Sequence, residues 1–223
     1  MRFIIPLLMT LMFFGVFIAG VIYLIAKTFF QMASVLPGSK AWDTILRSLR
    51  AIAQKHRPTL VPWDREMLPL VSLNQSETRK NGFFNPVRSG VFTTIYQEPV
   101  ISFVGQISGK NALMLAQTSD REFVFRRKNK ETEIWVNGAP LGVLVDGAFL
   151  APGRGSKLLA RLDARAGESQ TGVLLGDKTA ASLVNPGVDH ASPNPRALTL
   201  LRDLNQDEEN LVLALAILKM TGA

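Results

Sequence analysis

The hydrophobic positions of this chain begin with an unbroken apolar run. Residues 3–26 read FIIPLLMTLMFFGVFIAGVIYLIA, 24 residues without a charged side chain. At 1.5 Å per residue, a helix of this length reaches about 36 Å, which is enough to cross a hydrocarbon core of about 30 Å. The run therefore predicts a transmembrane helix, and we expect residues 1–36 to form a membrane anchor.

The alternative for this run is a cleaved signal peptide. Its apolar region would be about 7–15 residues long and would end in small residues. The run here is longer, and Gln31-Met32-Ala33 is a poor cleavage site, so the pattern favours an uncleaved, single-pass anchor. Gly15 and Ala19 form a small-x-x-x-small pair, the spacing that lets two membrane helices approach closely and dimerise.

The flanks of the run predict its orientation. Arg2 is the one basic side chain before the run, whereas Lys27, Lys40 and Arg47 follow it. Because Lys and Arg are retained on the cytoplasmic side, we expect the rest of the chain to lie in the cytoplasm, at the cell membrane.

A helical spacing of apolar residues follows the anchor. Pro37-Gly38 interrupts the first helix, and Ser39 is a suitable N-cap for a second one. The apolar positions of this basic amphipathic helix, within a linker of residues 37–67, are Trp42, Ile45, Leu46, Leu49, Ile52 and Ala53. Two interpretations remain open: the helix lies in the plane of the lipid headgroups, or its apolar face packs on the following domain.

From about residue 68 the pattern becomes one of short β-rich runs. The turn pairs Asn137-Gly138, Asp146-Gly147 and Gly176-Asp177, with Gly109-Lys110-Asn111, separate these runs. Short strands at regular spacing predict an antiparallel sandwich or barrel over residues 68–223. The expected strands are 70–73, 91–95, 100–107, 112–117, 122–127, 133–136, 140–145, 148–150, 158–162, 171–175 and 179–184.

The chain ends with a helical pattern. Residues 197–204 predict a short helix, and residues 211–218 (LVLALAIL) predict a final one after the acidic stretch that begins at Asp207. A helix that is apolar on every side must be buried, and eight residues are too few to cross a bilayer. We therefore expect a mainly β domain closed by a buried C-terminal helix.

This order of elements resembles the Tubby C-terminal-like superfold, which includes phospholipid scramblases and LURP-one-related proteins. The likeness covers about residues 68–220. It depends on the stretch from Asp207 to Asn210 leading into the apolar helix, and on strand-turn units such as 135–142. The resemblance implies a barrel around a central helix and, by analogy of fold, binding near lipids.

Composition and charge narrow the partners. The chain has no cysteine, which excludes disulfides, thiolate metal sites and cysteine nucleophiles. Residues 27–130 contain 16 Lys and Arg against 7 Asp and Glu, whereas residues 131–223 contain 8 against 11. The basic half therefore follows the anchor, which fits attraction to anionic headgroups. No recognition motif accompanies the charge, so no nucleic-acid partner is expected.

The sequence contains no recognisable catalytic set. His56 lies among basic residues, and His190 lies between Asp189 and Ser192 in one loop, whereas a catalytic triad is assembled from separate elements. Two histidines without cysteine do not form a conventional zinc site, and we expect no metal and no cofactor.

Basic side chains are the remaining candidates for a site. The expected lipid- or anion-binding residues are Lys40, Arg47, Arg50, Arg126, Arg127, Lys128, Lys130, Arg154 and Lys157. These residues, with the anchor, predict a non-enzymatic membrane-anchored β module that binds anionic lipid headgroups or a protein partner. The alternatives are a structural subunit of a multi-component membrane or envelope complex, with membrane protein partners, and an enzyme with an unrecognised site.

Overall fold

The computed structural model describes residues 14, 17–21, 37–80, 87–108, 111–153, 155, 157–163, 169–186 and 193–222. The chain divides into two compact units, Met1–Asp43 and Thr44–Ala223. Most of the expected span, residues 3–26, lies outside the described residues. Residues 14 and 17–21 of it are helical and exposed. Among the described residues, no helix has both the length and the apolar character needed to cross a membrane.

Helix α2 (Lys40–Ala53) begins in the first unit and ends in the second. The Trp42 backbone N–H donates to the Ser39 hydroxyl oxygen at 3.2 Å, and the Asp43 N–H donates to the Ser39 carbonyl at 3.0 Å. Ser39 therefore caps the helix as its sequence position predicted.

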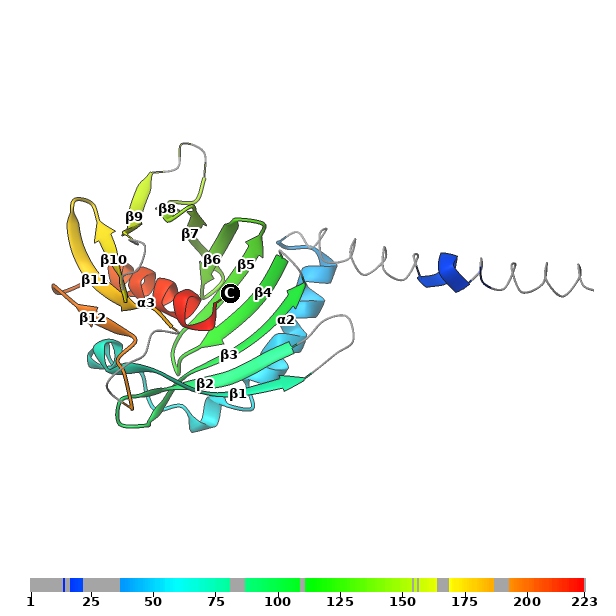
Figure 1. Ribbon diagram of the computed structural model, residues 1–223, viewed down its shortest axis with the longest axis horizontal. Helices are drawn as coiled ribbons and strands as arrows, with labels where there is room; N and C mark the ends of the chain where they lie inside the picture. Colours follow the sequence, from blue (N-terminus) through cyan, green and yellow to red (C-terminus); the bar gives the residue numbers. More distant parts are fainter. Residues whose placement is uncertain are drawn as a thin grey trace, which may run out of the picture. The chain divides into compact units, whose positions relative to one another are not determined.

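The second unit is a continuous antiparallel sheet. Its strands pair in sequence order, so each strand lies beside the next one along the chain (Figure 1). The 3-10 helices η1 (Arg57–Thr59) and η2 (Arg65–Leu70) precede the sheet. The described part of the chain contains twelve strands: β1 (Val71–Lys80), β2 (Val87–Thr94), β3 (Pro99–Ser108), β4 (Asn111–Gln117), β5 (Glu122–Lys128), β6 (Glu131–Val136), β7 (Ala139–Val145), β8 (Ala148–Leu150), β9 (Leu158–Asp163), β10 (Gln170–Leu175), β11 (Lys178–Val184) and β12 (Leu198–Leu200).

Hydrogen bonds between the two ends of the sheet make it a nearly closed barrel. The Ala197 N–H donates to the Val71 carbonyl at 2.8 Å, and the Leu73 N–H donates to the Pro195 carbonyl at 3.0 Å. An isolated antiparallel bridge joins Ser72 to Arg196 between these two bonds. The start of β1 and the residues before β12 thus satisfy backbone groups that an open sheet would leave at its edges.

One predicted element is wrong. Residues 197–204 do not form a helix, because Leu198–Leu200 form β12, which pairs with β11. Leu198 is fully buried and lies opposite Leu183. The segment has helix-forming residues, but the barrel needs a strand here to cover the outer edge of β11, and this pairing outweighs the local preference.

The other strands and their turns confirm the predicted mainly β architecture. Each expected strand has a counterpart, although β1 is much longer than the predicted 70–73. Asn137 and Gly138 have φ values of 51° and 80°, and Asp146 and Gly147 have 46° and 82°. Positive φ at both central residues is the requirement of a type I′ hairpin, which Asn-Gly and Asp-Gly pairs meet at low cost.

Helix α3 (Gln206–Thr221) is the central element of the barrel core. Every residue from Leu211 to Leu218 is buried, and the helix lies inside the curve of the sheet (Figure 1). The Asn205 side chain accepts from the Glu208 N–H, and the Glu208 carboxylate accepts from the Asn205 N–H, which completes a capping box. The predicted C-terminal helix is therefore confirmed, and it is longer than its apolar part.

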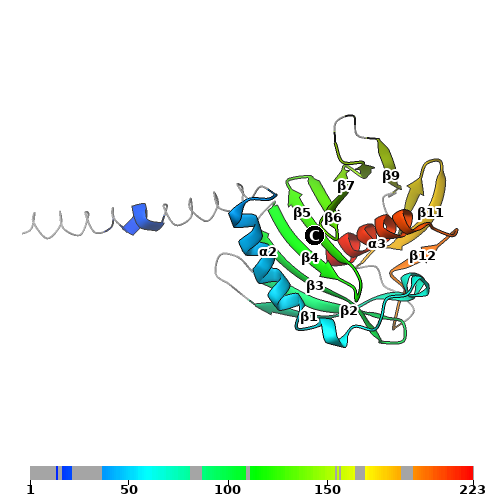
Figure 2. The same cartoon turned by 180° about the vertical axis from the view of Figure 1, so that it is seen from behind.

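The outer face of the sheet carries a second apolar layer. Strand β4 is buried at every residue from Ala112 to Gln117, so both of its faces are covered. Met114 and Ala116 belong to the core around α3, whereas Leu113 and Leu115 face the other way. Helix α2 runs along this outer side of β3 and β4 (Figure 2), and its Leu46 and Leu49 are buried. From Thr44 onward the apolar face of the helix packs on the barrel.

The absence of a side chain at Gly90 in β2 lets the Phe103 ring and the Ser76 backbone lie close to it, which allows a test of the core packing. A Cβ at Gly90 would lie 2.7 Å from the Phe103 ring and would clash with the Ser76 carbonyl oxygen. We expect Gly90→Ala to lower the free energy of unfolding by about 1–3 kcal/mol through overpacking. Gly105→Ala is the control, since its Cβ would meet Met114 at 3.4 Å. Equal urea midpoints for the two variants would contradict the close contacts at Gly90.

Candidate functional site

Two poles of the barrel are defined by the ends of α3. At the first pole, the guanidinium of Arg121 donates to the Glu209 carboxylate at 2.8 Å, in the first turn of α3. At the second pole, the Arg88 guanidinium donates to the Thr221 carbonyl at 3.3 Å. Strand β5 starts beside Arg121 and runs toward the second pole, so the β5–β6 hairpin lies at that pole.

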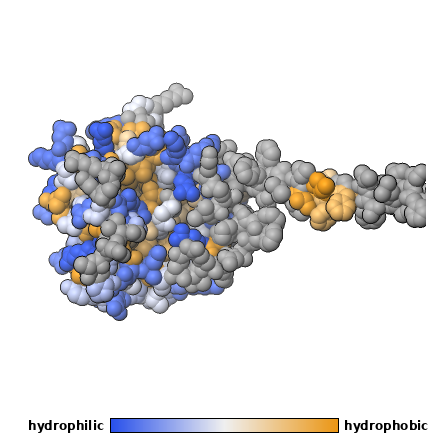
Figure 3. Space-filling view, in the orientation of Figure 1, coloured by the Kyte–Doolittle hydropathy of each residue, from blue (hydrophilic) through white to orange (hydrophobic). Residues whose placement is uncertain are grey.

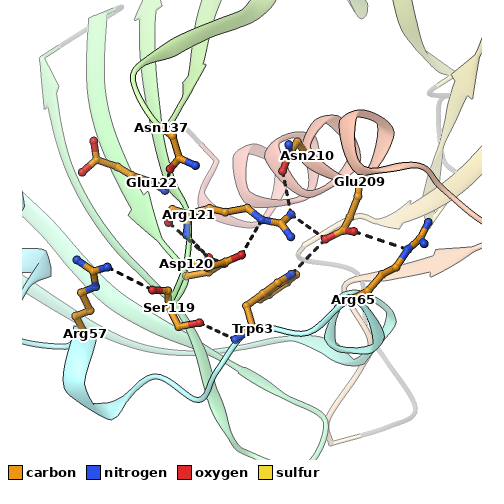
Figure 4. Close-up of polar contacts among 11 residues, drawn as sticks. Arg57, Trp63, Arg65, Ser119, Asp120, Arg121, Glu122, Asn137, Glu209 and Asn210 are labelled. Carbon is orange, nitrogen blue, oxygen red and sulfur yellow. Dashed lines mark hydrogen bonds and ion pairs between the residues drawn. The ribbon is translucent and has the colours of Figure 1, made fainter.

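Glu209 is a buried carboxylate at the first pole, with a side chain 4% exposed. The Trp63 indole N–H donates to it at 3.2 Å, and the Arg65 guanidinium lies 3.8 Å away (Figure 4). Arg121 also donates to the Asn210 side-chain oxygen at 2.9 Å. These contacts join the segment before β1, the β4–β5 turn and α3, three parts far apart in the sequence.

We call Glu209, Arg121, Trp63 and Arg65 the structural lock, because their contacts hold three distant segments together. The Trp63 and Arg121 hydrogen bonds both go to Oε1 of Glu209, and the Arg65 guanidinium forms an ion pair with Oε2, so the buried charge is paired. The Arg121 guanidinium lies 5.9 Å from the Trp63 ring centroid, a cation–π distance that further holds it in place. No group of three His, Cys, Asp or Glu side chains suited to a metal occurs among the described residues.

The lock gives a prediction for stability. Glu209→Leu should lower the free energy of unfolding by about 3 kcal/mol, because Arg121 loses its buried carboxylate partner and keeps only the exposed Asp120, at 3.1 Å. The double variant Arg121→Met, Glu209→Leu should recover part of that loss. Urea unfolding of the unaltered chain, of Glu209→Leu, of Arg121→Met and of the double variant measures both effects.

Glu133→Leu is the matched control for this cycle. Glu133 pairs with Arg126 at 2.8 Å, and Arg126 is as little exposed as Arg121, at 12%, but the Glu133 side chain is 36% exposed. We expect a loss of about 1 kcal/mol or less for a pair open to water. A Glu209→Leu loss no larger than that of Glu133→Leu would show that the lock does not stabilise the fold.

Of the basic residues predicted on α2, Arg50 binds a side chain of the barrel. Arg50 makes two hydrogen bonds to the Glu122 carboxylate, at 2.6 and 2.9 Å. Arg47 donates to the Thr44 hydroxyl at 3.4 Å and is exposed, as is Lys40 in the first unit. Arg50 therefore ties α2 to the start of β5, a role that its position in a basic helix did not predict.

The predicted cations of the β5–β6 hairpin lie together at the second pole. Lys128 and Lys130 are exposed, Arg127 is half-buried, and Arg126 pairs with Glu133 across the two strands. We call this end the basic pole and define it by Arg88, Arg126, Arg127, Lys128, Lys130 and Lys219. Glu131 and Glu133 lie in the same hairpin, so its own four cations face two carboxylates.

The remaining predicted residues are not brought together. Arg154 and Gly15 lie outside the described residues, and Ala19 is exposed in the helical stretch 17–21. Lys157 is exposed just before β9 and lines a hollow with Asp207 and Glu208, away from the hairpin.

That hollow is one of two that follow one side of α3. The first, of about 500 Å³, is lined mainly by leucines of β7, β9 and β10 and by Leu211. The second, of about 280 Å³, is lined by Leu144, Leu162, Leu183, Leu215, Leu218, Lys219 and Gly222. On the face drawn in Figure 3, apolar residues lie open to the surface between polar ones. Apolar hollows with a few charged groups at their ends are typical of ligand sites.

Sequence reasoning missed this apolar groove, which we define as the two hollows together. Its lining comes from leucines that read as ordinary strand and helix positions. The one available signal is the pair of leucines three residues apart in β7 and again in β9, which breaks the alternation of a strand with one buried face.

No protein-family model matches the chain, and no curated protein or solved structure matches it.

The end of the groove at the first pole carries an ion pair. Arg202 donates to the Glu208 carboxylate at 2.6 Å, and this hydrogen bond holds the pKa of Glu208 below its usual range. The same contact raises the pKa of Arg202 above its ordinary value. Glu208 is therefore ionised at neutral pH, and Arg202 balances its charge. The exposed Asp207 and Lys157 of the same hollow also carry opposite charges, so this end has no net positive charge to attract an anion.

Proposed function

We propose that the protein is a membrane-tethered, non-enzymatic β module whose basic pole binds anionic lipid headgroups. The observation that carries the proposal is the gathering of Arg127, Lys128 and Lys130 at one end of the barrel. Each cation held near an anionic surface contributes about 1 kcal/mol, so three to five of them produce useful, salt-sensitive affinity.

The direction of α2 also supports the basic pole as the end of the barrel that faces the membrane. Arg50 pairs with Glu122, and Arg57 donates to the Ser119 carbonyl, so the helix ends toward the first pole. Thr44 lies about 9 Å earlier along the helix axis, toward the basic pole. The second unit therefore begins on the side of the basic cations, which suits a domain tethered through its N-terminal side.

The uncharged run of residues 3–26 supports the tether, and the basic residues after it support a cytoplasmic location for the second unit. An antiparallel barrel around a buried C-terminal helix is compatible with a Tubby-like fold. We extend the proposal to membership of the Tubby C-terminal-like superfold, with binding next to lipids as the shared property.

The side of the membrane on which the second unit lies can be tested directly. A reporter enzyme that is active only outside the cytoplasm, fused to the C-terminus, should stay inactive, whereas a cytoplasm-dependent reporter at the same place should be active. The reverse pattern would overturn the cytoplasmic assignment. Release of a shortened, soluble chain would show that the apolar run is a signal peptide.

Headgroup binding is tested by hydrogen exchange on the full chain in nanodiscs. Amides of the β5–β6 hairpin should exchange at least several-fold more slowly with 30% phosphatidylglycerol than with phosphatidylcholine alone. The protection should disappear in 1 M salt, where the Debye length is about 3 Å. The triple variant Arg127→Glu, Lys128→Glu, Lys130→Glu should abolish it.

Lys178→Glu provides the control for charge reversal, because Lys178 is exposed and follows the β10–β11 turn at the first pole. It should leave the hairpin protection unchanged. Hairpin amides that exchange equally in both nanodiscs would refute headgroup binding. A defined set of membrane proteins that co-purifies with the chain and protects the hairpin instead would favour a subunit of a larger complex.

A further inference from the structure

We propose that the apolar groove along α3 holds one acyl chain of an anionic phospholipid, with the headgroup at the basic pole. This deepens the proposed function and rests on it, because it names what the module takes from the membrane. The groove is built from three elements, each of which contributes leucines to both hollows: β7, β9 and α3.

The three elements place the two hollows one after the other along α3, with no lining residue in common. Leu211, Leu215 and Leu218 lie at helical spacing on one side of α3. Leu141 and Leu159 line the first hollow, and their partners three residues later, Leu144 and Leu162, line the second. A linear ligand that follows α3 therefore meets leucine side chains along its length.

The length of the groove suits one chain. From Glu208 to Gly222 the helix axis rises about 21 Å. Half of a hydrocarbon core of about 30 Å, the depth of one leaflet, is about 15 Å. The helix is thus long enough to accompany a whole acyl chain. Of the three strand leucines in the second hollow, Leu183 is buried, whereas Leu144 and Leu162 are half-buried, so a chain would cover apolar surface that water now reaches at these two.

The charges at the two ends set the direction of the chain. Lys219 lines the second hollow and belongs to the basic pole. In the opposite hollow Asp207 and Glu208 lie beside Lys157, and Arg202 pairs with Glu208 at 2.6 Å. An anionic headgroup is therefore attracted to the Lys219 end and finds no net positive charge at the other, so the acyl tail points toward the first pole.

The test is native mass spectrometry of the full chain released from nanodiscs of equal phosphatidylglycerol and phosphatidylcholine. The unaltered chain should retain one phospholipid, with phosphatidylglycerol preferred. Leu162→Trp and Leu144→Trp each place a larger side chain in the second hollow from a half-buried position. Each should reduce the retained lipid at least tenfold.

Two controls separate the groove from the surface and from folding. Leu201→Trp adds the same side chain at a position 58% exposed and outside the hollows, and it should retain lipid normally. Lys219→Gln should keep the lipid and lose the preference for phosphatidylglycerol. Unchanged thermal midpoints for the two groove variants establish that they fold.

The outcomes distinguish the two proposals. Groove variants that lose the lipid but keep hairpin protection support the acyl site. A chain that retains no lipid, or groove variants that retain it as well as Leu201→Trp does, would overturn the acyl site and leave headgroup binding standing. Retention without any preference for phosphatidylglycerol would contradict the role of Lys219. A second protein copy in place of lipid would overturn the acyl site as well.

Discussion

The burial of α3 is the constraint on which the rest of the second unit depends. Residues 211–218 contain no polar side chain, so this helix has no face that water can solvate. The sheet buries the helix by curving around it, and the approach of β12 to β1 nearly closes the sheet into a barrel. The capping box at Asn205 and Glu208 satisfies the backbone where the helix enters this apolar space.

A helix inside a barrel must also be held in register along the barrel axis, and apolar contacts alone are poor at this because they are not directional. Glu209 supplies direction at one end through Arg121 and Trp63, and Arg88 contacts the backbone of Thr221 at the other. The acidic first turn of α3 matches the positive end of the helix dipole at the first pole. At the second, cations gather beside the negative end of the dipole, where they are favoured.

The same polarity links the two proposals. A barrel whose exposed cations gather at one end presents that end to an anionic surface, and the groove beside α3 leads away from it. Lys219 belongs to both features, since it lines the second hollow and lies at the basic pole. Headgroup contact and acyl insertion would therefore use one approach direction, set by charge, and one apolar path, set by the leucines of β7, β9 and α3.

The sequence by itself determined the elements with strong local causes: the helix cap at Ser39, the positive-φ turns at Asn137 and Asp146, and the buried final helix. It pointed to the cations of the β5–β6 hairpin because they are adjacent in the chain. Only the tertiary structure decided that Leu198–Leu200 form a strand, that Arg50 binds Glu122, and that Glu209 joins three distant segments. Those outcomes depend on partners far apart in sequence, and so does the apolar groove, whose leucines come from separate strands and meet only in the folded barrel.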